Sequence, residues 1–241
     1  MSKRWIKLLL LFILIMSVTG LSAKSIAEIY HDGGFFMHII TVVFVIMLVI
    51  ALFKFWQLSV KEKIDTKNFY LKLKGYIKNH QYDEAEKVCK QFKDTTMGFI
   101  FWNGLISFNE SRKAGKKGVD IEKSLQDSFD EAGLQTIPKI ESGLFWLDII
   151  AQVATLLGLL GTIFGLIKAF DGLANALPSE QNDILTSGIA QAMGTTAYGL
   201  IVAIPTMFIK GGLQARADKI INNIDEYSVK LINQIVLSTK E

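Results

Sequence analysis

Two long apolar segments, residues 149–170 and 188–208, contain polar but uncharged side chains of the types that can form hydrogen bonds inside a membrane. Five of them are candidates for a functional role. These are Thr155, Thr162, Gln191, Thr195 and Thr196. Hydroxyl and amide groups in such places either bond a neighbouring helix or line a path for an ion. The residue types leave both interpretations open.

Small residues accompany these polar groups at helical spacing. At about 100° per residue, glycine, alanine and threonine fall on one face of each segment and bulky side chains fall on the other. Small residues let helix backbones approach each other closely. The residues predicted to pack helices in this way are Gly158, Gly161, Gly165, Gly188, Ala192 and Gly199. The periodicity by itself favours helix packing over an ion path, because threonine is readily tolerated in a membrane helix.

Charged residues are absent from the middle of both segments. None occurs between Asp148 and Lys168, or between Asp183 and Lys210. A proton relay inside a membrane usually needs a titratable group. If protons cross the membrane here, we therefore expect another subunit to supply the carboxylate.

The composition restricts the other classes of function. The chain is 50% hydrophobic and 20% charged, which indicates membrane spans joined to an aqueous region. A net charge of +3 with interleaved acids does not suggest a nucleic-acid partner. Cys89 is the only cysteine and the three histidines form no cluster with metal-ligand spacing, so neither a disulfide, a metal site nor a cofactor is expected. No hydrolase or metalloprotease motif is present, and we predict that the chain is not an enzyme.

The elements that must position the polar residues are three predicted transmembrane helices of an all-α membrane protein, at 35–56, 145–170 and 188–209. Residues 1–23 have the basic start and short apolar core of a secretory signal peptide, with an uncleaved anchor as the alternative. Residues 24–34 would then form a short extracytoplasmic segment. Residues 57–140 are predicted as a helical cytoplasmic domain, 171–187 as a periplasmic loop and 210–241 as a cytoplasmic helical tail.

Charge distribution sets this orientation. Lys54, Lys61 and Lys63 follow the first span closely, and basic residues near a span accumulate on the cytoplasmic side. The segment 171–187 contains no Lys or Arg. The mature N-terminus is therefore expected in the periplasm and the C-terminus in the cytoplasm.

Apolar periodicity predicts short helices at 69–78, 83–92 and 97–109 in the cytoplasmic region. Asp83, three residues before Glu86, predicts a capping box at the start of the second. A longer helix over 119–147 is predicted to run almost directly into the second span, with Pro138 as a point where it bends or restarts.

Two sequence stretches resemble a known family. GLLGTIFGLIKAF from Gly158 and GIAQAMGTTAYGLIVAIPTMF from Gly188 are similar to the MotA/TolQ/ExbB proton channel family, in particular to its ExbB and TolQ branch. The stretch EAGLQTIPKIESGLFWLDIIA from Glu131 extends the resemblance. It implies an inner-membrane homo-oligomer, a pentamer, whose pore is lined by the second and third spans with the first span outside.

The resemblance also implies partners and residue roles. The partner would be an ExbD/TolR-like single-pass membrane protein whose aspartate carries the proton, with a TonB-like protein in the transport branch. The hydroxyl that the family carries on the third span corresponds to Thr196, and its acidic residue corresponds to Gln191, which removes a charge. On the second span, Thr155 and Val153 stand where the family often has a proline and a threonine. The residues also allow a non-conducting membrane scaffold in which the small faces only pack helices.

Overall fold

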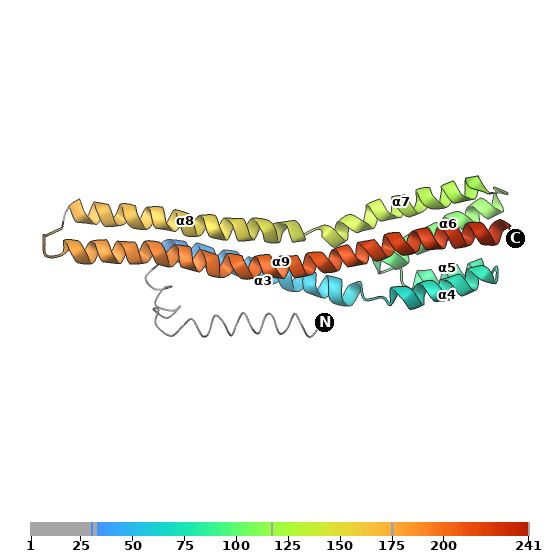
Figure 1. The fold of residues 1–241 in the computed structure, drawn as a ribbon, viewed down its shortest axis with the longest axis horizontal. Helices are drawn as coiled ribbons and strands as arrows, with labels where there is room; N and C mark the ends of the chain where they lie inside the picture. Colours follow the sequence, from blue (N-terminus) through green and yellow to red (C-terminus); the bar gives the residue numbers. More distant parts are fainter. Residues whose placement is uncertain (1–29, 31–32, 117, 175, 241) are drawn as a thin grey trace. The chain divides into compact units, whose positions relative to one another are not determined.

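The computed structural model describes residues 30, 33–116, 118–174 and 176–240. The predicted signal peptide and most of the segment 24–34 lie outside these residues. The described part of the chain is helical and contains no strand. In chain order its elements are α3 (Phe35–Trp56), the π-helical segment η2 (Gln57–Lys61), α4 (Thr66–Lys78), α5 (Tyr82–Gln91), α6 (Thr96–Lys113), α7 (Val119–Glu141), α8 (Leu144–Ala174) and α9 (Gln181–Lys240) (Figure 1).

Three helical stretches, which contain α3, α8 and α9, are long and apolar enough to cross a membrane. This confirms the predicted all-α membrane protein with three candidate spans. The chain divides into two compact units. The first unit comprises the described residues up to Met47 together with Ile149–Met207, and the second comprises Leu48–Asp148 and Phe208–Glu241.

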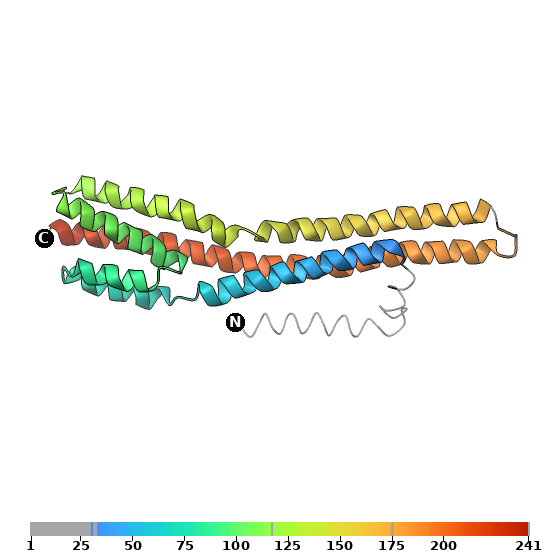
Figure 2. The same cartoon turned by 180° about the vertical axis from the view of Figure 1, so that it is seen from behind.

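In the first unit, α8 and α9 lie side by side, as both Figure 1 and Figure 2 show. The buried core of this unit joins Ile40 of α3 to alanines of α8 and to Val202 and Ala203 of α9. The remaining surface of α3 is apolar and exposed, with Val42 at 59% and Val45 at 52%. A helix that is apolar on all sides and lacks a seam of small residues suits contact with lipid.

The second unit has an aromatic and aliphatic core beneath the amphipathic helices. Phe101 of α6 is fully buried, and its ring lies 5.9 Å from that of Phe69 and 5.6 Å from that of Phe129. The C-terminal part of α9 contributes the buried residues Ile224, Leu231 and Ile235. Polar side chains cap the N-termini of two helices. Asp65 accepts a hydrogen bond from the Asn68 backbone N–H at the start of α4, and Thr95 accepts one from the Gly98 backbone N–H at the start of α6.

The predicted capping box at Asp83 is wrong. Helix α5 begins one residue earlier, at Tyr82, and its N-cap residue Gln81 forms no side-chain cap. Tyr82 is buried, so its ring fixes the helix start through core packing instead. Asp83 therefore lies inside the first turn, where an acidic side chain favourably meets the helix dipole.

Helix boundaries around the spans also differ from the sequence-based expectations. Helix α7 ends at Glu141 and α8 begins at Leu144, so the predicted single helix over 119–147 is interrupted. Gly143 has φ +85°, a conformation that ends a right-handed helix and that glycine adopts without strain. Pro138 stays within the last turns of α7. Helices α8 and α9 extend into both ends of the segment 171–187, which was predicted as a loop.

Candidate functional site

The backbones of α8 and α9 touch where the small residues face each other. A Cβ atom built on Gly199 would lie 2.6 Å from the carbonyl oxygen of Ala154. A Cβ on Gly158 would lie 3.1 Å from the carbonyl oxygen of Thr195, and one on Gly165 would lie 3.1 Å from Ala192. These positions leave no space for a side chain without moving a helix.

Gly161 and Gly188 are equally crowded. The Thr195 side chain occupies the space over Gly161, where an added Cβ would lie 2.7 Å from Thr195 Oγ1, and Ala169 occupies the space over Gly188. All six residues that the sequence predicts to pack helices thus lie in the contact between α8 and α9.

Thr196 forms the hydrogen bond that joins the two helices. Its Oγ1 donates to the carbonyl oxygen of Gly158 on α8, at 3.1 Å. Thr196 is half-buried, so one side of the residue remains accessible. The hydroxyl that the family resemblance singles out is therefore anchored on a glycine carbonyl of the neighbouring span.

Thr195 points into the contact. It is 1% exposed, and its hydroxyl donates to the carbonyl of Ala192 one turn earlier, at 2.7 Å. Within a single chain, Thr195 therefore packs against α8 and does not reach an open surface.

Thr155 and Thr162 flank the contact on α8 instead of entering it. Their hydroxyls donate within the helix, to the carbonyls of Ala151 at 3.0 Å and Leu159 at 2.6 Å. Thr155 is exposed and Thr162 is half-buried. Both hydroxyls are within reach of a molecule that lies along this side of α8.

Gln191 faces a different neighbour. Its side-chain amide nitrogen lies directly against Gly34, at the start of α3. Seven residues later on α9, the Tyr198 hydroxyl lies 3.0 Å from Thr41 Oγ1 of α3. Helix α9 therefore turns its small residues toward α8 and a separate polar edge toward α3, and Gln191 lies on that second edge.

Sequence reasoning missed the pair formed by Tyr198 and Thr41. The available signal was a tyrosine inside an apolar segment, because a buried phenol normally requires a hydrogen-bond partner. It also missed an ion pair in the second unit, where Lys210 Nζ lies 3.0 Å from an Asp148 carboxylate oxygen. These two residues had marked only the ends of the uncharged segments.

The residues that the structure describes contain no group of His, Cys, Asp or Glu side chains suited to a metal ion. The site consists of hydroxyl, amide and backbone groups that can exchange hydrogen bonds but cannot hold a permanent charge.

Comparisons with known proteins agree on the region that contains these helices. The model of the MotA/TolQ/ExbB proton channel family matches residues 101–226. Biopolymer transport protein exbB1 of Vibrio cholerae is 36% identical over 116 residues, which are 47% of this chain and 50% of that protein. The Tol-Pal system protein TolQ of Pseudomonas aeruginosa is 34% identical over 53% of this chain and 55% of its own length.

TolQ of Haemophilus influenzae is 29% identical over 56% of this chain and 61% of its own length. The chain therefore spans between half and about three fifths of the length of these relatives. The family model covers more than half of the chain, including α7, α8 and the membrane part of α9. On this evidence, the chain belongs to the MotA/TolQ/ExbB proton channel family.

Proposed function

We propose that this chain is the inner-membrane channel subunit of a proton-driven motor of the ExbB/TolQ type, which couples the proton motive force to work on the cell envelope. The observation that carries the proposal is the paired surface of α8 and α9, with hydroxyl groups but no charged side chain along the segments 149–167 and 184–209. The proposed partner is an ExbD/TolR-like single-pass membrane protein that supplies the carboxylate.

The uncharged surface suits a moving carboxylate. A fixed acid on α8 or α9 would compete with the partner's acid for the proton, whereas threonine hydroxyls can accept and donate hydrogen bonds without holding a charge. Each proton that crosses 100 mV releases about 2.3 kcal/mol, so a few protons are enough to drive a protein rearrangement.

The proposed assembly is a homo-oligomer, a pentamer, in which Thr155, Thr162, Thr195 and Thr196 lie on or beside the pore wall.

We propose a narrower, structural role for Gln191. Because its amide lies against Gly34, the residue just before α3, it braces the start of the first span against α9 in the single chain. The mature N-terminus is proposed to be periplasmic and the C-terminus cytoplasmic, with a TonB-like protein as a further partner in the transport branch.

A second candidate function is a non-conducting membrane scaffold. The observation that favours it is that the four predicted pore-lining threonine hydroxyls already donate to backbone carbonyls. Helix packing alone would account for that arrangement.

Proton flux distinguishes the two candidates. The full chain would be reconstituted in liposomes that contain a pH-sensitive dye, alone and with an ExbD/TolR-like partner, under a membrane potential. The channel proposal expects flux with the partner and a loss of flux when the partner's membrane aspartate is changed to asparagine. Absence of flux with every partner, despite a co-purifying complex, would favour the scaffold.

A further inference from the structure

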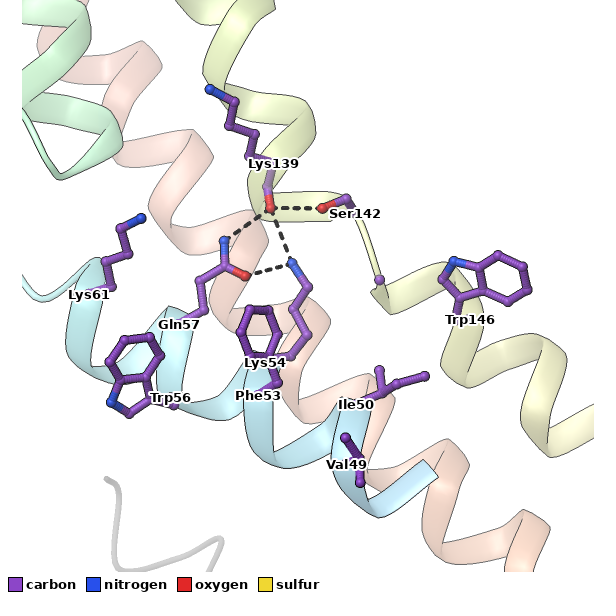
Figure 3. Close-up of a pocket in the computed structure, with 11 residues that line it drawn as sticks. Val49, Ile50, Phe53, Lys54, Trp56, Gln57, Lys61, Lys139, Ser142 and Trp146 are labelled. Carbon is purple, nitrogen blue, oxygen red and sulfur yellow. Dashed lines mark hydrogen bonds between the residues drawn. The ribbon is translucent and has the colours of Figure 1, made fainter. Parts of the chain in front are cut away.

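A cavity of about 570 Å³ opens in the second unit beside the break between α7 and α8 (Figure 3). One wall comes from the end of α3 and η2, and the other from the end of α7 and the start of α8. It is lined by Val49, Ile50, Phe53, Lys54, Trp56, Gln57, Lys61, Lys139, Ser142, Gly143 and Trp146. Its volume falls within the range of small-molecule sites.

A buried lysine holds the two walls together. Lys54 is 3% exposed, and its Nζ donates to the carbonyls of Lys139 at 3.1 Å and Ile140 at 3.4 Å. It also donates to the Gln57 side chain at 2.9 Å, and Gln57 donates to the Lys139 carbonyl at 3.2 Å. Figure 3 shows the Lys54 ammonium and the Gln57 side-chain amide both directed at the Lys139 carbonyl oxygen. The charge of Lys54 therefore stabilises the C-terminal end of α7 and links the two walls of the cavity.

The rest of the lining is divided into a basic end and an apolar end. Lys61 and Lys139 are exposed, and no acidic residue lines the cavity. Among the described residues, no ion pair is formed by either lysine. Figure 3 shows the Lys139 ammonium extending away from Lys54.

At the other end, apolar side chains remain uncovered. Val49 is 62% exposed and Trp146 is 57% exposed. Both residues lie on helical stretches that contain candidate spans. Tryptophan is enriched at the level of lipid headgroups, and lysine next to a span attracts anionic lipid. An inorganic anion would satisfy the lysines but would leave this apolar wall uncovered.

We propose that the cavity binds one anionic phospholipid from the adjacent membrane leaflet. The phosphate and headgroup lie near Lys61 and Lys139, and the acyl chains lie along Val49, Phe53 and Trp146. The lipid rests on the end of α3 and on both sides of the break at Gly143, so it would stabilise the geometry of that break. This site is separate from the contact between α8 and α9 and does not depend on proton conduction.

The test uses the full chain in phosphatidylcholine nanodiscs that contain a small fraction of dibrominated phospholipid, which quenches nearby tryptophan. Trp56 and Trp146 line the cavity and serve as reporters. The apparent affinity of each brominated lipid is obtained from the quenching of tryptophan fluorescence. We expect this affinity to be higher for dibrominated phosphatidylglycerol than for dibrominated phosphatidylcholine, by roughly fivefold for each contributing lysine.

The decisive variant is Lys61→Gln with Lys139→Gln, which should abolish the preference for the anionic lipid. The matched control is Lys63→Gln with Lys123→Gln, which removes the same charge from exposed lysines outside the cavity and should keep the preference. Lys61→Arg with Lys139→Arg should also keep it.

Three results would overturn the proposal. They are equal quenching by the two lipids in the unmodified chain, an equal loss of preference in both glutamine variants, and no quenching by either lipid. The last result would mean that another part of the assembly covers the cavity.

Discussion

The Thr196 hydroxyl and the Gly158 carbonyl oxygen are joined by a hydrogen bond of 3.1 Å across the contact between α8 and α9. Gly158 allows this approach, because a Cβ on it would lie 3.2 Å from the Cα of Thr196. The hydrogen bond therefore depends on the absence of a side chain at Gly158. A larger residue at 158 would separate the helices, and loss of the hydroxyl would leave the helices close but without this bond.

Thr196→Val tests that hydroxyl with little change in side-chain volume. We expect the variant to assemble and to lose about 0.6–1.7 kcal/mol of stability, the range for hydrogen bonds between membrane helices. We also expect proton flux with the partner to fall to the background level. Thr196→Ser, which keeps a hydroxyl, should restore flux. Thr186→Val is the control, because the Thr186 hydroxyl donates only within α9, to the Asn182 carbonyl, and should leave flux unchanged. Full activity of Thr196→Val would rule out a role for this hydroxyl in conduction.

Gly199→Ala tests the close approach of the backbones. The added methyl group would lie 2.6 Å from the Ala154 carbonyl oxygen, so the helices must separate, at a cost of about 1–3 kcal/mol. The midpoint of thermal unfolding in detergent, followed by circular dichroism, should fall. Gly211→Ala on the same helix is the matched control, because no atom beyond the local backbone of α9 lies within 4 Å of the added methyl group. That change should be neutral or should stabilise the helix by up to about 1 kcal/mol. Equal midpoints for the two variants would contradict the close contact.

The periodic small residues were enough to predict the contact between α8 and α9. A repeat near 3.6 residues places them on one face of each helix, and that face can approach another helix closely. The pair formed by Tyr198 and Thr41 could not be predicted in the same way. Helix α3 is apolar all round, so its sequence does not fix its rotation, and only its packed position brings Thr41 to the tyrosine.

The break between α7 and α8 was also beyond the sequence pattern. Pro138 is the stronger helix breaker, yet it is accommodated within the last turns of α7 and the chain turns at Gly143 instead. The end of α7 is stabilised by Lys54, which donates hydrogen bonds to carbonyl oxygens there although it lies more than eighty residues earlier in the chain. Contacts between residues so far apart in sequence leave no local signal.

We expect the Cys89 thiol to be unreactive towards thiol reagents in the folded chain. It is fully buried, and burial, together with the nearby Glu86 carboxylate, raises the pKa of its thiol. A thiol reagent at pH 8 should therefore react only as fast as α5 opens, and addition of denaturant should accelerate the reaction strongly. Cys89→Ser is the blank for this measurement. Rapid labelling without denaturant would show that the packing around α5 is loose.

The raised thiol pKa also predicts a direction for stability against pH. The folded state keeps the thiol proton at pH values where the unfolded chain, with a pKa near 9, releases it. The stabilisation is therefore complete well below the pKa of the unfolded thiol and decreases as pH rises through and above that pKa. In Cys89→Ala this component of the alkaline loss should disappear, whereas an identical pH profile would show that Cys89 does not contribute.

Asp148 and Lys210 form an ion pair of 3.0 Å between the start of α8 and the middle of α9, in the second unit. Both side chains are partly exposed, 41% for Asp148 and 27% for Lys210, so solvent screens the attraction. We expect a coupling free energy of about 0.2–1 kcal/mol from a double-mutant cycle with Asp148→Asn and Lys210→Gln. The coupling should shrink at high salt, because a screened pair depends on ionic strength. The exposed pair of Glu226 and Lys230, one turn apart on α9, serves as the comparison. It joins residues of a single helix, so breaking it should leave the contact between α8 and α9 intact. A coupling near zero for Asp148 and Lys210 at low salt would show that the pair does not help to hold the two helices together.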